Sequence, residues 1–554
     1  MKSVFSFLLF VSTIFLSEKA NSQTWDQYGG FAEISFTGGN GFFRTEFDGD
    51  QWWLVTPDNN AFLSLGINHF HSNLWKKDYN KSYWENELGG AIGSNNWNNG
   101  WYQHAIDITK SVGANSMGYH NEDAILKSRD SFLPYIRQYR PLDISMHQRA
   151  EASDYMDVFS TEFKERCDSK ANSQVKPFIN DKMIIGYAMS DVPVLTDVYA
   201  RTAGGNAGIP TFAMVLRNLA STAPGKQEYV KTMKTIYSGI SEFNNTYNTS
   251  YSSWTDLENA TNWRKKTDFD NAKEISDNNL FNKICISKYY EVALASFRAV
   301  DQNHMFLGDK LNANIRDISE LELLVDAVKD YVDVVLFQYY GKDQAQKDIQ
   351  DLIASIGNKP MINGDGGFGS NDDPQMPNPQ TPTAANQSQR AIWFNQYAKD
   401  AFSNPNFVGW HVCGVIDSWA ASSGTGRQKP GVMNPLGVAH QTVMDTLATL
   451  YSKVYKFRML DAPDPTIPLS VVGYTGNLEY TFWPNPTKGV IHFDTHAYYG
   501  ISEIMIFDVT GKIAGTFRPN NTQFDLTIDG RPGIYYLKVK SNKETRTFKV
   551  IKRL

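Results

Sequence analysis

Cysteine is scarce in this sequence, and its scarcity excludes a disulfide framework. Only Cys167, Cys285 and Cys413 occur in 554 residues, an odd and sparse set that does not suit a stapled fold. Stability must come from a large core, which a hydrophobic content of 41% can fill. We expect three buried thiols. No cluster with metal-ligand spacing is found, so we predict no metal and no other cofactor.

An excess of basic residues is also lacking. Lys and Arg number 53 against 59 Asp and Glu, which gives a net charge of −6. No block of basic residues stands anywhere in the chain. A nucleic-acid partner is therefore not expected.

Long apolar runs are missing, apart from one at the N-terminus. The run Phe5–Leu16 follows Lys2 and precedes the small residues Ala20-Asn21-Ser22. It is too short to span a bilayer, so residues 1–22 are predicted to be a secretory signal peptide. We expect the mature chain to begin near Gln23, outside the cytoplasm. No later segment is apolar enough for a membrane span.

Strand-like and helix-like segments alternate over residues 61–456, which predicts a parallel sheet with crossover helices. Expected strands are 62–69, 114–119, 136–142, 183–189, 304–308, 333–340, 360–363 and 407–412, and the clearest helices are 279–300, 319–331 and 387–402. Eight such strands close an α/β fold of the (β/α)8 (TIM barrel) type. An open doubly wound sheet is the alternative. We disfavour it because no glycine-rich phosphate loop follows the first strand.

Four other regions differ in pattern from the barrel. Residues 23–60 contain short aromatic and β-branched strands separated by turns. Residues 197–278 are a polar, partly helical insertion, with a helix expected over 225–244, that could wall the top of the barrel. Residues 457–472 are proline-rich and predicted to be a linker. Residues 473–554 alternate with period two, which predicts a small all-β sandwich.

The C-terminal region carries a specific set of motifs. They are Trp483-Pro484-Asn485-Pro486 followed by Gly489, then FDVTGK at 507–512, then PGIYYL at 532–537. In this order and spacing they resemble the C-terminal sorting domain of type IX secretion substrates. The resemblance implies the type IX machinery as a partner, removal of the domain, and attachment to the cell surface or release. A carbohydrate-binding sandwich is the alternative.

Polar residues follow several of the expected strands. The stretch KPMINGDGGFG (359–369) places Asp365 after an apolar run, and MIIGYAMSDVP (183–193) places Asp191 likewise. The carboxyl ends of barrel strands are where chemistry takes place. Glycoside hydrolysis needs two carboxyl groups across the scissile bond. Further candidates at strand ends are Asn68, His69, His120, Glu122, Asp309, Gln338, Tyr339, Tyr340, Trp410, His411 and Trp419.

These further candidates allow two interpretations. Each residue taken alone is more often solvated or part of the packing than part of a site. The aromatic content of 13% suits sugar-stacking platforms and a large aromatic core equally. Their recurrence at successive strand ends is what favours a site.

Residues 30–455 resemble the agarase-like glycoside hydrolases of the large (β/α)8 clan. The resemblance is carried, in family order, by GFFRTEFDGDQWWLVTPDNNAFLSLGINHF, DVFSTEF, IIGYAMSDVP, APGKQEYVKTM, YNTSYSSWTDL, DVVLFQYYG, KPMINGDGGFG, FVGWHVCGVIDSW, Gly426-Arg427 and GVMNPLG. It implies hydrolysis of β-linked red-algal galactans: agar, porphyran or carrageenan.

The sequence departs from the clan at both catalytic positions. The fourth strand of the clan ends in Asn-Glu, the Glu being the acid/base, whereas this strand ends in Ser190-Asp191-Val192-Pro193. Asp191 takes the Glu position if a one-residue gap is allowed, and Val192 takes it otherwise. Asp365 stands where the nucleophilic Glu is expected. Shorter Asp side chains would widen the pair towards the spacing of inverting enzymes.

Two functions from different classes follow. The first is an active secreted glycoside hydrolase with Asp191 as the acid and Asp365 as the nucleophile or base. Asp309, Glu122 and His411 are fallbacks for a displaced carboxylate or its orienting partner. The second is a galactan-binding protein on an inactive glycosidase barrel. Arg427 is expected either to pair with a sulfate or to form a structural ion pair.

Overall fold

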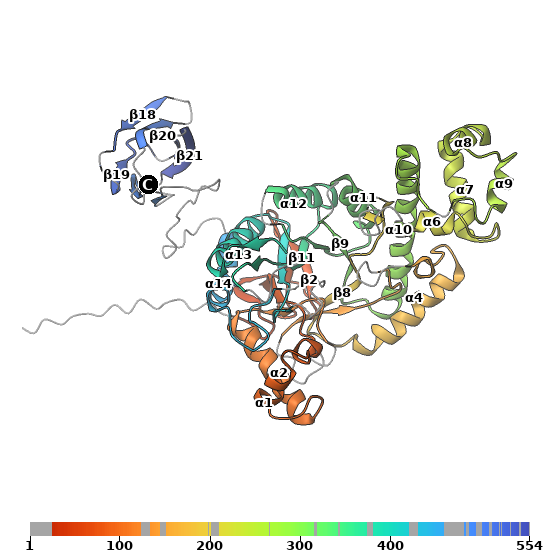
Figure 1. The fold of residues 1–554 in the computed structure, drawn as a ribbon, viewed down its shortest axis with the longest axis horizontal. Helices are drawn as coiled ribbons and strands as arrows, with labels where there is room; N and C mark the ends of the chain where they lie inside the picture. The colour runs from red at the N-terminus through yellow and green to blue at the C-terminus, as the bar shows by residue number, and fades with distance from the viewer. Residues whose placement is uncertain are drawn as a thin grey trace, which may run out of the picture. The chain divides into compact units, whose positions relative to one another are not determined.

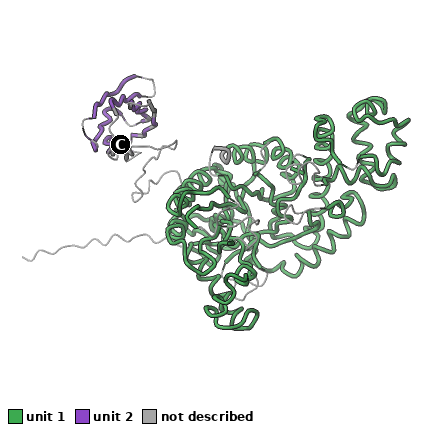
Figure 2. Tube along the Cα trace, viewed as in Figure 1, with its two compact units in different colours: residues 1–459 green, residues 460–554 purple. Residues whose placement is uncertain are grey.

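The computed structural model forms two compact units, residues 1–459 and 460–554 (Figure 2). It describes residues 25–122, 133–144, 151–197, 199–200, 210–264, 266–314, 318–341, 344–373, 381–419, 430–451, 453–458, 481–483, 487–494, 501–508, 512–519, 521, 523–531, 533–541 and 545–552. The predicted signal peptide, Arg427 and most of the predicted linker lie outside these residues.

The first unit is built on a closed barrel of eight parallel strands, which confirms the predicted (β/α)8 fold. The order around the barrel is β10-β11-β14-β5-β6-β7-β8-β9, so the last strand pairs with the first. Most barrel residues are fully buried, as expected of strands covered on both faces. The strands are β5 (Ser64–Ile67), β6 (Ser116–Met117), β7 (Tyr135–Gln138), β8 (Ile184–Asp191), β9 (Met305–Asn312), β10 (Val335–Gln338), β11 (Met361–Gly366) and β14 (Phe407–Val412).

Helices surround the barrel (Figure 1). Several begin at a side chain that caps the first turn, as Asn386 does by accepting a hydrogen bond from the backbone N–H of Gln389. The helices are α1 (Lys81–Glu87), α2 (Asn95–Ser111), α4 (Thr161–Gln174), α10 (Ala272–Val300), α11 (Ile318–Val328), α12 (Gln344–Gly357), α13 (Gln387–Phe402), α14 (Gln441–Tyr451) and α15 (Val454–Arg458), with 3-10 turns at Ser72–Trp75, Ala152–Asp154 and Lys176–Phe178. Cys167, Cys285 and Cys413 are buried free thiols, as predicted.

A small antiparallel sheet precedes the barrel, in the strand order β1-β4-β3-β2. It packs against the start of barrel strand β14, where the Trp52 amide donates to the Pro405 carbonyl at 2.8 Å. Arg458 joins the two by donating to the carbonyls of Trp52, Pro405 and Phe407. The sheet therefore lies at the amino-end face of the barrel, opposite the strand ends proposed for chemistry. Its strands are β1 (Phe31–Ser35), β2 (Arg44–Phe47), β3 (Trp52–Val55) and β4 (Asn60–Phe62), and a short pair β12 (Gly369–Ser370) and β13 (Thr383–Ala384) lies elsewhere in the unit.

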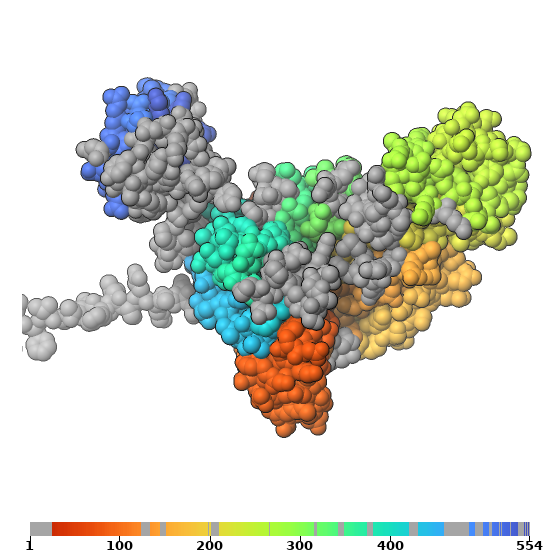
Figure 3. Space-filling view, in the orientation of Figure 1, coloured from red at the N-terminus to blue at the C-terminus, as the bar shows by residue number. Residues whose placement is uncertain are grey.

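The insertion between β8 and β9 is a helical lobe, α6 (Phe212–Leu216), α7 (Pro224–Ile236), α8 (Ile240–Tyr247) and α9 (Trp254–Asn259), attached to the first part of α10. Figure 3 shows it in yellow-green, projecting from the rest of the unit. The single helix expected over 225–244 is two, because the chain is extended at Tyr237 and Gly239. The buried carboxylate of Asp197 joins the lobe to α10, accepting from Thr211, Thr267 and Asn278.

The second unit contains two antiparallel sheets, β15-β16-β19 and β18-β17-β20-β21. Apolar side chains from both sheets, among them Ile491, Leu526 and Leu537, share one core. This is the arrangement of a sandwich, as the alternating pattern predicted. The strands are β15 (Thr481–Trp483), β16 (Val490–Asp494), β17 (Ile501–Asp508), β18 (Ile513–Phe517), β19 (Gln523–Thr527), β20 (Gly533–Ser541) and β21 (Thr545–Lys552). No helix in the described part of either unit has the length and apolarity needed to cross a membrane.

Candidate active site

Asp191 and Asp365 meet at the carboxyl ends of two barrel strands. Asp191 ends β8, the fourth barrel strand, and Asp365 lies near the end of β11, the seventh. Both contact the ammonium of Lys310, with Nζ 2.8 Å from Asp191 Oδ1 and 2.9 Å from Asp365 Oδ2. As two sides of one triangle, these distances place the facing oxygens at most about 5.7 Å apart, which is below the ~6.5–9.5 Å of inverting glycosidases.

The expected widening of this pair is therefore not observed. Inverting enzymes separate their carboxyl groups by about 6.5–9.5 Å to admit a water molecule. Both carboxylates instead contact the same ammonium, that of Lys310.

Lys310 is a residue of this site that the sequence analysis missed. Its side chain is completely buried, and Nζ also lies 2.9 Å from His120 Nε2. An ammonium has three N–H groups, and three acceptors stand at that distance. The signal was present in the sequence, because a lysine in an apolar strand must find partners when it is buried.

A bulge in β9 turns Lys310 towards the barrel interior. Phe306 faces outward against Phe297 of α10, so strict alternation would direct Asp309 inward and Lys310 outward. Gly308 instead adopts a left-handed conformation with φ of 68°, and the pairing with β8 shifts beside it. A Cβ at Gly308 would lie 2.6 Å from Cε1 of Tyr290, so only glycine fits.

Two histidines and an amide complete the cluster. His120 Nε2 lies 3.2 Å from Asp191 Oδ2, and His69 Nε2 lies 3.8 Å from Asp365 Oδ2. The two imidazole rings stack at 4.5 Å. Asn68 donates from Nδ2 to Asp365 Oδ1 at 3.2 Å. Polar groups from β8, β9, β11 and the ends of β5 and β6 thus converge on one point.

The charges of the cluster keep both carboxylates ionised. Burial alone raises the pKa of Asp191, but the charge of Lys310 and the contacts with His120 outweigh it, so that pKa lies well below 3.8. Burial likewise raises the pKa of Asp365, and Lys310 together with His69 brings it well below 3.8. Burial lowers the pKa of Lys310, but the two aspartates raise it above its usual value. Burial and Lys310 lower the pKa of His120.

Backbone strain is stored on both sides of the cluster. His69 has a φ of 66° and Val192 a φ of 42°, and a β-branched residue in this region is an outlier. Strain of this kind is typical of functional sites. Asp191 and Val192 are the two residues that could take the acid position. Val192 is fully buried, and Asp191 presents its carboxylate to the cluster.

The three fallback residues lie apart from the carboxylate pair. Asp309 accepts from the Ser190 amide and from the Tyr290 hydroxyl, both at 2.8 Å, on the helix side of the barrel wall. Glu122 accepts from the amide and hydroxyl of Ser72 at 2.7 Å. His411 is buried within the barrel with Nε2 2.8 Å from Ser64 Oγ, and burial lowers its pKa to about 3. Each has a structural partner of its own.

We expect Asp309→Asn to change the pH dependence of stability. Burial raises the pKa of Asp309 from 3.8 to about 6, so its stabilising contribution is complete below pH 3.8 and is lost as the pH rises through 6. The loss amounts to about 3 kcal/mol. Thermal melting from pH 4 to pH 7 should fall more for the wild type than for the variant. If wild type and variant differed in melting temperature by the same amount at every pH, as expected of the exposed control Asp107→Asn, the buried Asp309 carboxyl would not be the titrating group.

The predicted sugar contacts divide into buried and accessible side chains. Trp410 is fully buried with its ring 4.3 Å from that of Tyr397 on α13, so in this structure it packs and offers no face to a sugar. Gln338 and Tyr339 are nearly buried at the end of β10, and Tyr340 beside them is partly exposed. Trp419 is partly exposed, its Nε1 donating to Asp373 Oδ2 at 3.0 Å, with Tyr79 at 5.7 Å between ring centroids.

His69, Asp365 and Cys413 place ligand atoms within 4.8 Å of one another, a spacing that could hold a metal ion. The ammonium of Lys310 already lies 2.9 Å from Oδ2 of Asp365. A cation there would face that charge at short range. The donor set therefore does not suit a metal.

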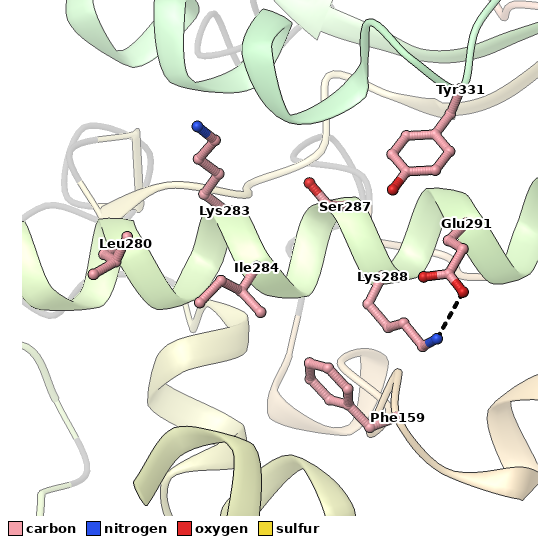
Figure 4. A pocket seen from close by; sticks show the side chains of 8 residues that line it. All are labelled: Phe159, Leu280, Lys283, Ile284, Ser287, Lys288, Glu291 and Tyr331. Atoms are coloured by element: carbon pink, nitrogen blue, oxygen red, sulfur yellow. Dashed lines mark hydrogen bonds and ion pairs between the residues drawn. The ribbon is translucent and has the colours of Figure 1, made fainter. Parts of the chain in front are cut away.

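A separate hollow of about 410 Å³ lies on the outer face of α10. Figure 4 shows Phe159 and Tyr331 on opposite sides of the helix, with Lys288 paired to Glu291. Most of the lining belongs to α10 itself, including Leu280, Lys283, Ile284 and Ser287. None of the residues predicted for chemistry lines this hollow.

Comparisons with known proteins agree with this division into two units. Residues 481–553 match the family model described as the secretion system C-terminal sorting domain. β-Agarase B of Vibrio sp. (strain JT0107) is 26% identical over 196 residues, which is 35% of this chain and 20% of that protein. The chain thus spans about a fifth of the length of this curated relative.

Solved structures, two of them of agarases, share the fold of the first unit. The agarase AgWH50C superposes with a TM-score of 0.64 at 20% identity, covering 78% of this chain and 68% of that one. An exo-β-agarase gives the same TM-score and coverage at 18% identity. PfGH50B gives 0.64 at 22% identity, with 78% and 69% covered.

The first unit is a (β/α)8 barrel with a cluster of buried charged groups at the carboxyl ends of its strands. More particularly, the barrel unit is agarase-like in fold, and the chain carries a secretion system C-terminal sorting domain. The sorting domain directs the protein to the cell surface or the extracellular space by type IX secretion.

Proposed function

We propose that the protein is a secreted glycoside hydrolase that cleaves a β-linked galactan of the agarose type. The observation that carries the proposal is the pair Asp191 and Asp365, with facing oxygens at most about 5.7 Å apart at the carboxyl ends of β8 and β11. The similarity to β-agarase B in sequence and to agarases in fold supports the substrate class. Two alternative substrates are porphyran and carrageenan, with which Arg427 would pair through a sulfate group.

The spacing favours a retaining reaction in two steps. Asp365 attacks the anomeric carbon while Asp191 gives a proton to the leaving oxygen, so the glycosidic C–O bond breaks and a glycosyl ester forms. Asp191 then takes a proton from water, which displaces the ester and releases Asp365. His69 and His120 surround the same point and would contact sugar hydroxyls, whereas Asn68 is fully buried and bonds to Asp365. Tyr340 and Trp419 are the accessible rings for stacking.

The test is a product profile on agarose, porphyran and the carrageenans. Because the pKa of Asp191 is held well below 3.8, less of its proton-donating form exists as the pH rises. We expect oligosaccharide release from agarose with a rate that increases from about pH 8 to about pH 5. NMR of the first-formed anomer should show retention. An inverted anomer would exclude the two-step scheme, and no release from any galactan would exclude the hydrolase.

A second function is favoured by one observation, the complete burial of Lys310 between the two carboxylates. A pair held ionised lacks a proton donor at neutral pH, so the barrel could bind galactan without cleaving it. Pull-down on agarose beads separates the two functions. Retention on the beads without reducing-sugar release over the whole pH range would favour the binding protein.

Processing is proposed at both ends of the chain. The apolar run at 5–16 supports removal of residues 1–22 as a signal peptide, and the sorting domain supports removal of the second unit after export. The mass of the protein recovered from the medium would test both cleavages.

A further inference from the structure

We propose that Lys310 is a positioning residue that clamps Asp191 and Asp365 at reacting distance and fixes the protonation state of the pair. The inference rests on the proposed hydrolase function for its consequence in catalysis, but the clamp itself can be measured without activity.

The geometry of Lys310 is that of a clamp. Its Nζ donates to Asp365 Oδ2 at 2.9 Å, lies 2.9 Å from His120 Nε2 and forms an ion pair with Asp191 Oδ1 at 2.8 Å. The side chain has no exposed surface, and the Tyr119 ring lies 5.4 Å from the ammonium. The Val192 amide donates to the Lys310 carbonyl at 2.9 Å, which also fixes the backbone beside Asp191.

The clamp explains how two short side chains can serve in place of longer ones. Each aspartate ends one methylene earlier than a glutamate would, and the like charges repel each other. A cation held between them attracts both carboxylates and removes that repulsion. The cluster of Asp191, Asp365 and Lys310 then carries one net negative charge instead of two.

Other titratable groups around the pair come from several elements. His69 and His120 follow β5 and β6, Tyr119 precedes His120, His411 lies on β14, and Tyr340 and Cys413 follow β10 and β14. Arg140 and Tyr199 act on Asp191 over a longer range. Among the described residues, Lys310 is the only cation within 4 Å of both carboxylates besides His120 when protonated. Loss of Lys310 therefore removes the ammonium that contacts both carboxylates.

The test compares Lys310→Met with wild type by two readouts. Without the ammonium, one member of the pair should hold a proton at neutral pH. On agarose oligosaccharides, kcat/KM is expected to fall as the pH rises. In Lys310→Met we expect this fall to occur at a pH about 2 units or more higher than in wild type. Carbon-13 NMR of Asp-labelled protein should show one carboxyl titrating above about pH 6, whereas in wild type both stay ionised to about pH 4. Asp191→Asn and Asp365→Asn assign the two resonances.

Lys226→Met is the matched control. Lys226 is also wholly buried, but among the described residues its ammonium bonds to the backbone carbonyls of Arg217 and Ala260 in the α6–α9 lobe, so its loss should leave both readouts at wild-type values. Lys310→Gln, which is one bond shorter than lysine and keeps an N–H donor without the charge, replaces Lys310→Met if the latter does not fold.

The outcomes separate this inference from the proposed function. An unchanged pH profile, with both carboxyls ionised in Lys310→Met, would overturn the clamp even if the wild type is a hydrolase. No cleavage by either protein would overturn the hydrolase, and the carboxyl titration would still decide the clamp. The clamp would be supported if Lys310→Met cleaved the substrate near neutral pH and one of its carboxyls titrated at a higher pH than in wild type.

Discussion

Asp365→Asn is expected to abolish cleavage of agarose while leaving galactan binding within about threefold of wild type. The carboxylate is the proposed nucleophile, and an amide of the same shape cannot form the glycosyl ester. Removing such a group lowers kcat by on the order of 10⁴-fold or more. The amide oxygen of the variant can still accept from one of the two donors, Asn68 or Lys310, while its NH2 group faces the other. Initial rates of reducing-sugar release, with binding measured by calorimetry, check this result.

The matched control is Asp107→Asn, which makes the same chemical change on the exposed face of α2. It should retain wild-type rates. If Asp365→Asn kept more than about a tenth of the wild-type rate, another carboxylate would be the nucleophile. If binding were lost together with cleavage, Asp365 would be a substrate-binding residue rather than the attacking group.

Arg217→Met is expected to cost about 3–5 kcal/mol in local stability, the largest structural effect predicted for this chain. Arg217 is fully buried in the α6–α9 lobe, where Nη1 donates to Glu274 Oε1 at 3.0 Å and Nη2 donates to the Arg264 carbonyl at 3.0 Å. Methionine would leave the Glu274 charge buried with Arg264 alone beside it. Hydrogen exchange measured by mass spectrometry over residues 212–300 should show the loss of protection.

Two further variants test the reason for that loss. The double variant Arg217→Met with Glu274→Leu removes both charges and should recover most of the stability, because the buried uncompensated carboxylate is gone. Arg518→Met breaks an exposed ion pair with Glu503 in the second unit and should cost less than about 1 kcal/mol. Equal losses in the buried and exposed variants would contradict the role of burial.

Much of the fold follows from local sequence patterns. The runs at 62–69, 183–189 and 407–412 are apolar enough to be buried on both faces, and each contains or overlaps a barrel strand. Alternation with helices leaves few topologies, because parallel strands require long crossovers. The same reasoning placed Asp191 and Asp365 at strand ends on one face of the barrel. The period of two in the C-terminal unit likewise predicted its sheets.

The details of the site could not be predicted from local patterns, because they depend on whether each side chain points into the barrel or out of it. Asp309 and Lys310 are neighbours in sequence, and the bulge at Gly308 decides which of them enters the barrel. Trp410 stands between Gly409 and His411 at a predicted strand end, but its ring packs against Tyr397 of α13, which the crossover helix brings there. Neither contact is encoded near these residues in the sequence.

By itself, then, the sequence determined the class of fold, the secretion signal in the tail and the two strand ends that carry carboxylates. Periodicity and motif spacing are local properties, so they can be read without a structure. Only the tertiary structure decided that a lysine stands between those carboxylates and how far apart they lie. Those features arise where strands distant in sequence are brought into register, and a one-residue bulge there exchanges the side chains that face the interior.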